Sequence, residues 1–184
     1  MTMKQPLKLN DQKYCSWCGS ELEWNKDFAV CSGCAKHQFL NPRPCTAVFV
    51  IYNHRVLLLK RSIEPKIDLL DLPGGFVDVG DESMERGALR ELKEETSLLL
   101  NESELKYLGS SLYEDYIYEG VQIPTMTSYF VAPATSSQAE SIILDHENSD
   151  HLWVDIDKVA KSELAFEAYW PMIDKLKTLM SSGN

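Results

Sequence analysis

The sequence predicts an α/β protein that follows a small cysteine-bound unit at the N-terminus. Two apolar, β-branched runs at residues 46–52 and 56–60 have the composition of buried strands. Residues 81–98 follow a glycine-rich turn and have the spacing of an amphipathic helix. Four of the five cysteines lie within the first 34 residues. At 184 residues, the chain can bury one sizeable core and carry a small appendage.

The cysteines of the N-terminal region form two Cys-x2-Cys pairs separated by twelve residues. This pattern is typical of a zinc ribbon, in which a short hairpin brings four thiolates around a tetrahedral metal. Four thiolates leave no open coordination position, so we interpret the zinc as structural, and it would supply most of the folding energy. The alternatives are two disulfides or a redox-active pair; no secretion signal precedes the cysteines, which weighs against disulfides. The expected ligands are Cys15, Cys18, Cys31 and Cys34.

A connector containing two prolines, at residues 41–44, follows the cysteine pairs. Each proline fixes its own backbone and keeps the preceding residue out of the helical conformation, so this segment is stiff and extended. We therefore expect a zinc ribbon at residues 1–40 and a second domain at residues 41–184.

The second half of the chain predicts a long hairpin, a polar loop and a C-terminal helix. Residues 106–118 and 121–131 are the expected strands, and Glu119-Gly120 is the expected turn. Residues 133–140 are small and polar, which is typical of a mobile loop. The remaining expected elements are a strand around 152–154 and helical segments from 157 to about 161 and from 170 to about 180.

Three carboxylates crowd one patch of the predicted helix. Glu91 and Glu95 are four residues apart, and Glu94 is three residues after Glu91, so the side chains meet on the helix surface. One interpretation is a solvated acidic face that Arg90 partly neutralises. The other is a divalent cation site, because hard cations such as Mg²⁺ take oxygen ligands. Gly87, one turn before Glu91, favours the cation: it removes a side chain above the carboxylates at a cost of about 1 kcal/mol in helix propensity.

The glycine-rich turn and the helix together resemble the sequence box of the Nudix hydrolases, Gly-x5-Glu-x7-Arg-Glu-(apolar)-x-Glu-Glu-x-Gly-(apolar). The second half of the box matches from Arg90 onward, and Glu82 stands the expected distance before Arg90. Two positions differ from the pattern. Six residues separate Gly75 from Glu82, so either the loop has one extra residue or Asp81 takes part of the role. Ser97 replaces the last glycine, and we expect it to end the helix in a left-handed conformation.

The Nudix resemblance implies an α/β/α sandwich with a mixed sheet and a site for Mg²⁺ or Mn²⁺. By resemblance, Glu91, Glu94 and Glu95 would bind the metal. The Gly74 carbonyl would add a further ligand. The expected cofactors are thus a catalytic divalent cation in this domain and a structural Zn²⁺ in the ribbon.

The resemblance also implies roles for residues beside the metal. Arg90 would orient the carboxylates, and Glu82 would support the loop through a hydrogen bond or an ion pair. Glu94 is the first candidate for the general base, and Glu147, in a later loop, is the second.

The activity implied by the resemblance is metal-dependent hydrolysis of the diphosphate linkage in a nucleoside diphosphate joined to another group. The cysteine pairs and the Asn-Pro connector resemble the zinc-ribbon branch of the family, which includes NADH pyrophosphatases. The expected substrates are dinucleotides such as NADH or FAD, ADP-ribose and nucleotide sugars. The Ser-Gln-Pro-Trp-Pro-Phe-Pro-x-Ser array associated with NADH pyrophosphatases is absent after the box. The alternative is a non-catalytic module that senses a nucleotide and binds a partner through the ribbon.

The formal net charge of −10 argues against general binding to nucleic acids or anionic membranes. The sequence has no apolar run of about 18 residues, and its start does not resemble a signal peptide. We therefore expect a soluble cytoplasmic protein whose partner is a small nucleotide, and the family resemblance adds a homodimer as a second expected partner.

Overall fold

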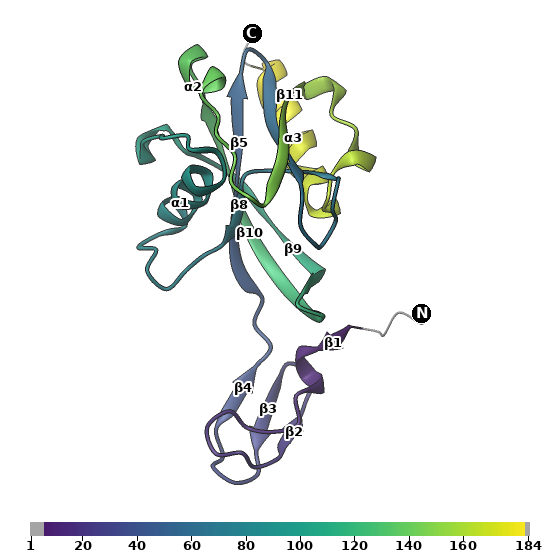
Figure 1. Ribbon diagram of the computed structural model, residues 1–184. Helices are drawn as coiled ribbons and strands as arrows, with labels where there is room; N and C mark the ends of the chain where they lie inside the picture. Colours follow the sequence, from purple (N-terminus) through teal and green to yellow (C-terminus); the bar gives the residue numbers. More distant parts are fainter. Residues whose placement is uncertain (1–5, 183–184) are drawn as a thin grey trace. The chain divides into compact units, whose positions relative to one another are not determined.

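The protein is described by a computed structural model that covers residues 6–182. The chain forms two compact units (Figure 1). The smaller unit contains the residues up to Arg43 together with Glu114–Thr125. The larger unit contains Pro44–Tyr113 and the chain from Met126 onward. The smaller unit therefore includes the tip of a hairpin whose strands begin and end in the larger unit.

A three-stranded antiparallel sheet forms the centre of the smaller unit. Its strands are β2 (Leu22–Trp24), β3 (Phe28–Cys31) and β4 (His37–Phe39). The hairpin of β2 and β3 is the one that the sequence predicts, whereas β4 is too short and too polar to give a strand pattern. The remaining N-terminal elements are β1 (Leu7–Lys8), which pairs in parallel with the start of β10 (Val121–Pro133), and the 3₁₀ turn η1 (Leu9–Asp11).

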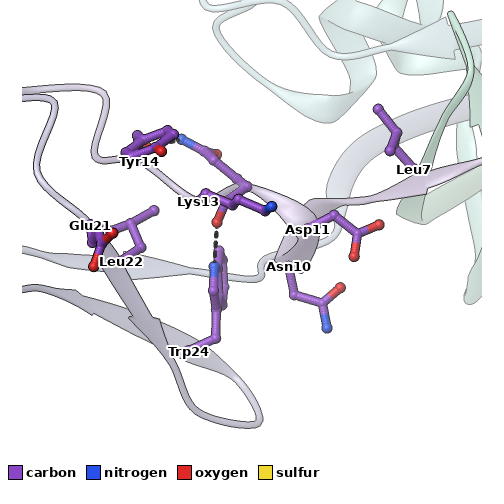
Figure 2. A pocket seen from close by; sticks show the side chains of 9 residues that line it. Leu7, Asn10, Asp11, Lys13, Tyr14, Glu21, Leu22 and Trp24 are labelled. Atoms are coloured by element: carbon purple, nitrogen blue, oxygen red, sulfur yellow. Dashed lines mark hydrogen bonds between the residues drawn. The ribbon is translucent and has the colours of Figure 1, made fainter.

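The smaller unit also has an open pocket of about 590 Å³ (Figure 2). Its wall is held by the indole of Trp24, whose Nε1 donates a 2.7 Å hydrogen bond to the backbone oxygen of Gln12. The lining mixes apolar, amide and charged side chains, so it carries neither a concentrated charge nor a continuous apolar surface.

A mixed sheet forms the centre of the larger unit. Strand order within it is β10-β5-β6-β11, with β9 on β10, β8 on β5 and β7 on β6. The strands are β5 (Arg43–Tyr52), β6 (Arg55–Arg61), β7 (Leu70–Asp71), β8 (Gly74–Phe76), β9 (Lys106–Tyr118), β10 (Val121–Pro133) and β11 (Asn148–Asp155). The long strands match the expected ones closely, because their apolar patterns are local and strong.

Helices cover both faces of this sheet, so the expected α/β architecture is confirmed. Figure 1 shows α1 (Met84–Thr96) and α3 (Trp170–Ser182) on opposite sides. Side chains alternate accordingly along β5. Val48 and Val50 belong to the core cluster that includes Leu92 of α1. Phe49, between them, packs with Tyr129 at a ring distance of 6.2 Å.

The segment expected to be a mobile loop contains a short helix instead, α2 (Ser136–Glu140). The side-chain oxygen of Thr135 accepts the backbone N–H of Gln138 at 3.3 Å, and Gln138 reaches back to the N–H of Thr135 at 2.8 Å. This capping box explains how a small polar segment becomes helical. The remaining short elements are η2 (Glu102–Glu104), η3 (Ile156–Lys158), η4 (Lys161–Glu163) and η5 (Glu167–Tyr169). None of the helices within residues 6–182 is long and apolar enough to cross a membrane.

Candidate functional site

The carboxylate-bearing helix α1 is built as the sequence predicts. It begins after Ser83, whose hydroxyl accepts the backbone N–H of Arg86 at 3.1 Å, and it buries Ala88, Leu92 and Thr96. It ends at Ser97, which has the expected left-handed conformation with φ 59°. Because one face of α1 is fixed in the core, Glu91 and Glu95 lie against the start of β8.

Gly74 brings the backbone against Glu95. Its N–H donates a 2.7 Å hydrogen bond to Oε2 of Glu95. A Cβ at this position would lie 2.1 Å from the backbone oxygen of Thr46, and φ is +154°, so only glycine fits. Burial raises the pKa of Glu95 well above its usual value, and the charge of Asp71 raises it further.

Gly75 makes the same close approach to Glu91. A Cβ at Gly75 would lie 2.8 Å from the carboxyl carbon and both oxygens of Glu91. Burial raises the pKa of Glu91, although the neighbouring Arg90 opposes that shift. Two adjacent glycines therefore place main chain directly against two of the three glutamates of the predicted metal site.

Arg90 connects the loop to the carboxylates. One terminal nitrogen donates to Oε1 of Glu91 at 2.8 Å and to Oε2 of Glu94 at 3.0 Å. The other donates to the backbone oxygen of Phe76 at 3.0 Å and to Oδ2 of Asp81 at 2.9 Å, while Nε donates to Oδ1 of Asp81 at 3.1 Å. These contacts lower the pKa of Asp81 and raise that of Arg90. The guanidinium is thus fixed on both sides.

The loop contact expected of Glu82 is made by Asp81. Within residues 6–182, Glu82 has no hydrogen bond or ion pair, whereas Asp81 holds Arg90 in a two-bond contact. We expected Gly87 to make room for a ligand above the carboxylates. Its neighbour is instead Asp81, because a Cβ at position 87 would lie 2.9 Å from Oδ2 of Asp81. The signal for Asp81 was present in the sequence, since five residues separate it from Gly75.

The late loop brings an unexpected acid, Asp145, to this region. Its N–H donates to the backbone oxygen of Glu95 at 3.3 Å, and its charge contributes to the raised pKa of Glu95. Glu147, the residue expected here, gives its backbone N–H to Oδ1 of Asp145 at 3.0 Å, and its side chain makes no hydrogen bond or ion pair with the described part of the chain. Proximity to Glu147 was the only sequence signal for Asp145.

The donor set fits a hard divalent cation. Glu91 and Glu95 are carboxylates withdrawn from water, and a cation beside them would favour their charged form. In this structure the sulfurs of the four N-terminal cysteines all lie within 4.8 Å of one another, whereas the carboxylate oxygens of Glu91, Glu94 and Glu95 do not. Arg90, between Glu91 and Glu94, supplies the positive charge that the carboxylates share.

The four N-terminal cysteines form a second candidate metal centre. All four sulfurs lie within 4.8 Å of one another. All are free thiols, with sulfur distances of 3.8 Å from Cys15 to Cys34 and 3.4 Å from Cys18 to Cys31, so the disulfide alternative is not realised. Backbone N–H groups donate to the sulfurs of Cys15 and Cys31 at 3.4 Å, and hydrogen bonds from Ser20 lower the pKa of Cys18 to about 6. A tetrahedral thiolate metal such as Zn²⁺ fits this set.

Comparison with known proteins gives one family and several similar structures. The family model of the NUDIX domain matches residues 41–176. An ADP-ribose pyrophosphatase from Methanocaldococcus jannaschii is 38% identical over 61 residues, which are 33% of this chain and 36% of that protein. The chain therefore spans about a third of the length of this relative.

Two solved structures share the fold. A MutT/nudix family protein from Enterococcus faecalis superposes with a TM-score of 0.62 at 23% identity, covering 78% of this chain and 64% of that one. The NUDIX domain of Shewanella oneidensis NrtR, solved in complex with ADP ribose, superposes with a TM-score of 0.61 at 25% identity, covering 77% of this chain and 90% of that one.

Proposed function

Because the chain belongs to the Nudix hydrolase family, we propose that it is a metal-dependent pyrophosphohydrolase that cleaves the diphosphate linkage of ADP-ribose or of a nucleotide of the same class. The observation that carries this proposal is the contact of Gly74 and Gly75 with Glu95 and Glu91. The close approach joins β8 to α1, and every acidic residue of the box motif is intact. Glu91 and Glu95 are held against these glycines, whereas Glu94, on the same helix, is exposed to water.

The roles that we propose follow from the contacts. Glu91, Glu94 and Glu95, with the carbonyl of Gly74, would hold Mg²⁺ or Mn²⁺. When bound, the cation would neutralise phosphate charge and lower the pKa of a water molecule. Arg90 holds Glu91 and Glu94 at fixed positions through hydrogen bonds of 2.8 and 3.0 Å.

Glu94 is our candidate for the general base. Its side chain is 58% exposed, against 16% for Glu91, so water can reach it. In the reaction, a water oxygen bonds to one phosphorus, the bond from that phosphorus to the bridging oxygen breaks, and Glu94 takes the water proton. ADP-ribose would yield AMP and ribose 5-phosphate. Glu147 is the second candidate, and its free side chain leaves it available.

The substrate class rests on the relatives. The archaeal relative is named an ADP-ribose pyrophosphatase, and the Shewanella domain was solved with ADP ribose. NADH and FAD, which the zinc-ribbon resemblance suggests, contain the same adenosine diphosphate group. We therefore rank ADP-ribose first and the dinucleotides second. We also propose that the Zn²⁺ is structural, that the protein is cytoplasmic and that it forms a homodimer. Light scattering of the purified protein tests for the homodimer.

The test is phosphate release, after phosphatase treatment, from ADP-ribose, NADH, NAD, FAD, nucleotide sugars and nucleoside triphosphates with Mg²⁺ or Mn²⁺. The wild type should hydrolyse ADP-ribose, and Glu94→Gln should be slower by about 10²- to 10⁴-fold, the usual worth of a general base. Glu85→Gln, in the first turn of the same helix, is the matched control and should retain full activity. If the folded wild type binds ADP-ribose without cleaving any compound, the nucleotide-sensing alternative replaces this proposal.

A further inference from the structure

The larger unit contains a buried polar network that the proposed chemistry does not use. It joins Arg61 at the end of β6, Asp71 in β7 and Tyr169 in η5. We propose that Tyr169 is a positioning residue for the metal site, and that it acts through Asp71 on the backbone of Gly74, at the start of β8. This inference rests on the proposed function only in taking Glu91, Glu94 and Glu95 as cation ligands.

Asp71 is the centre of the network. It is 7% exposed and receives donors from three directions. Oδ2 accepts Arg61 at 2.5 Å, and Oδ1 accepts both the backbone N–H of Leu72 at 2.8 Å and the hydroxyl of Tyr169. A buried carboxylate held by this many donors has one orientation, because any rotation would leave a buried donor unpaired.

The two partners of Asp71 are themselves fixed. Arg61 donates through Nε to the backbone oxygen of Pro65 at 2.7 Å, and its guanidinium lies 5.6 Å from the centre of the Phe166 ring. Tyr169 is 8% exposed and packs edge-on against Tyr129 at 5.9 Å and Phe166 at 5.7 Å. The C-terminal segment thus delivers one hydroxyl to a carboxylate 98 residues earlier in the sequence.

A short, rigid path leads from Asp71 to the metal site. Leu72 donates its backbone N–H to Asp71 and is 2% exposed. The backbone oxygen of the next residue, Pro73, accepts the N–H of Val48 at 2.9 Å. The next residue, Gly74, donates its N–H to Glu95 at 2.7 Å. Each step is a hydrogen bond or a tightly packed residue, so the orientation of Asp71 sets where the N–H and carbonyl of Gly74 point.

Tyr169→Phe tests the proposal, because it removes one hydroxyl and keeps the ring, its packing and the charge of the network. Tyr129→Phe is a matched control: this buried tyrosine, in contact with Tyr169, bonds to Ser111 at 2.9 Å and not to Asp71. Mn²⁺ affinity of the zinc-loaded full chain, measured by electron paramagnetic resonance without nucleotide, is the readout that a purely structural role would not move.

We expect Tyr169→Phe to weaken Mn²⁺ binding by about 10-fold or more, the usual effect of losing a group that orients a metal ligand. Tyr129→Phe should stay within about twofold of the wild type. The inference is overturned if Tyr169→Phe binds Mn²⁺ like the wild type, or if both variants lose affinity in parallel with thermal stability. Wild-type protein that binds Mn²⁺ but hydrolyses nothing would end the proposed function and leave the positioning role intact.

Discussion

The two units of this chain differ in the residues that they bury. Of the described residues of the smaller unit, Cys15, Ala29 and Cys31 are buried in the N-terminal part, and two of these three are expected metal ligands; the hairpin tip adds only Ile123 and Thr125. The larger unit instead has a core cluster in which β5, β6, β10 and α1 each contribute fully buried aliphatic or aromatic side chains. Apolar burial at about 25 cal/mol per Å² can hold the second but not the first. The comparison therefore predicts that folding of the smaller unit depends on a metal and that folding of the larger unit depends on its apolar core.

Removal of zinc should give the largest difference in stability between the two units. Cys31→Ser, or a strong chelator, should unfold β2, β3 and β4, because structural Zn²⁺ supplies about 10 to 16 kcal/mol of binding energy in domains of this size. Amide signals of β5 and β6 should persist in a two-dimensional NMR spectrum. Dispersed β2–β4 signals in zinc-free protein would show that the small unit does not depend on metal.

The reciprocal experiment creates a cavity in the core of the larger unit. Leu92→Ala should lower the free energy of unfolding of the larger unit by about 2 to 5 kcal/mol, since Leu92 is fully buried in the cluster around α1. Denaturant titration followed by circular dichroism measures this. Leu99→Ala, at a leucine that is 68% exposed, is the control and should change stability by about 0.5 kcal/mol or less. An equal loss in both variants would refute the core-dependent description.

The polar contacts of the loop should matter less than the core. Asp81→Asn should lower the free energy of unfolding by about 1 to 3 kcal/mol, because Arg90 loses a charged two-bond partner. Glu82→Gln, one residue later, should have little effect.

The pH dependence of the Asp81 effect has a defined sign. The folded-state pKa of Asp81 lies below its unfolded value, so its contribution is present above about pH 4 and is lost as pH falls through the folded pKa. Urea unfolding of wild type and Asp81→Asn at pH 7 and near pH 3 measures it. If the difference in free energy of unfolding between wild type and Asp81→Asn grew toward low pH, the assignment would be contradicted.

The smallest expected effect is at the end of α1. Ser97→Gly should stabilise the larger unit by about 0.5 to 1 kcal/mol, because a left-handed conformation strains serine and not glycine. The gain is limited by the loss of a long 3.3 Å contact from the Ser97 hydroxyl to the backbone of Ile143. A higher melting temperature by calorimetry would confirm it, and a lower one would mean that this contact outweighs the strain.

Local patterns predicted the elements well, and tertiary contacts accounted for what they missed. The helix face of Ala88 and Leu92 and the hairpin of β9 and β10 follow from periodicity, which a single segment contains. The bond from Tyr169 to Asp71 spans 98 residues, and no local pattern can anticipate it. Asp145 was missed for the same reason, since its place beside Glu95 exists only after the late loop closes on α1.

The two adjacent glycines of β8 differ in how a damaging substitution could be repaired. Gly75 does not share the positive φ of Gly74, and the obstacle to a Cβ at Gly75 is the end of the Glu91 side chain. A shorter carboxylate at position 91 would leave room for the Cβ. We therefore expect Glu91→Asp to suppress the folding defect of Gly75→Ala. For Gly74 the obstacle is main chain of Thr46 and Ala47, which no side-chain exchange removes. A genetic selection for folded protein, independent of activity, should therefore recover compensated variants of a substitution at position 75. At position 74 it should recover only true revertants.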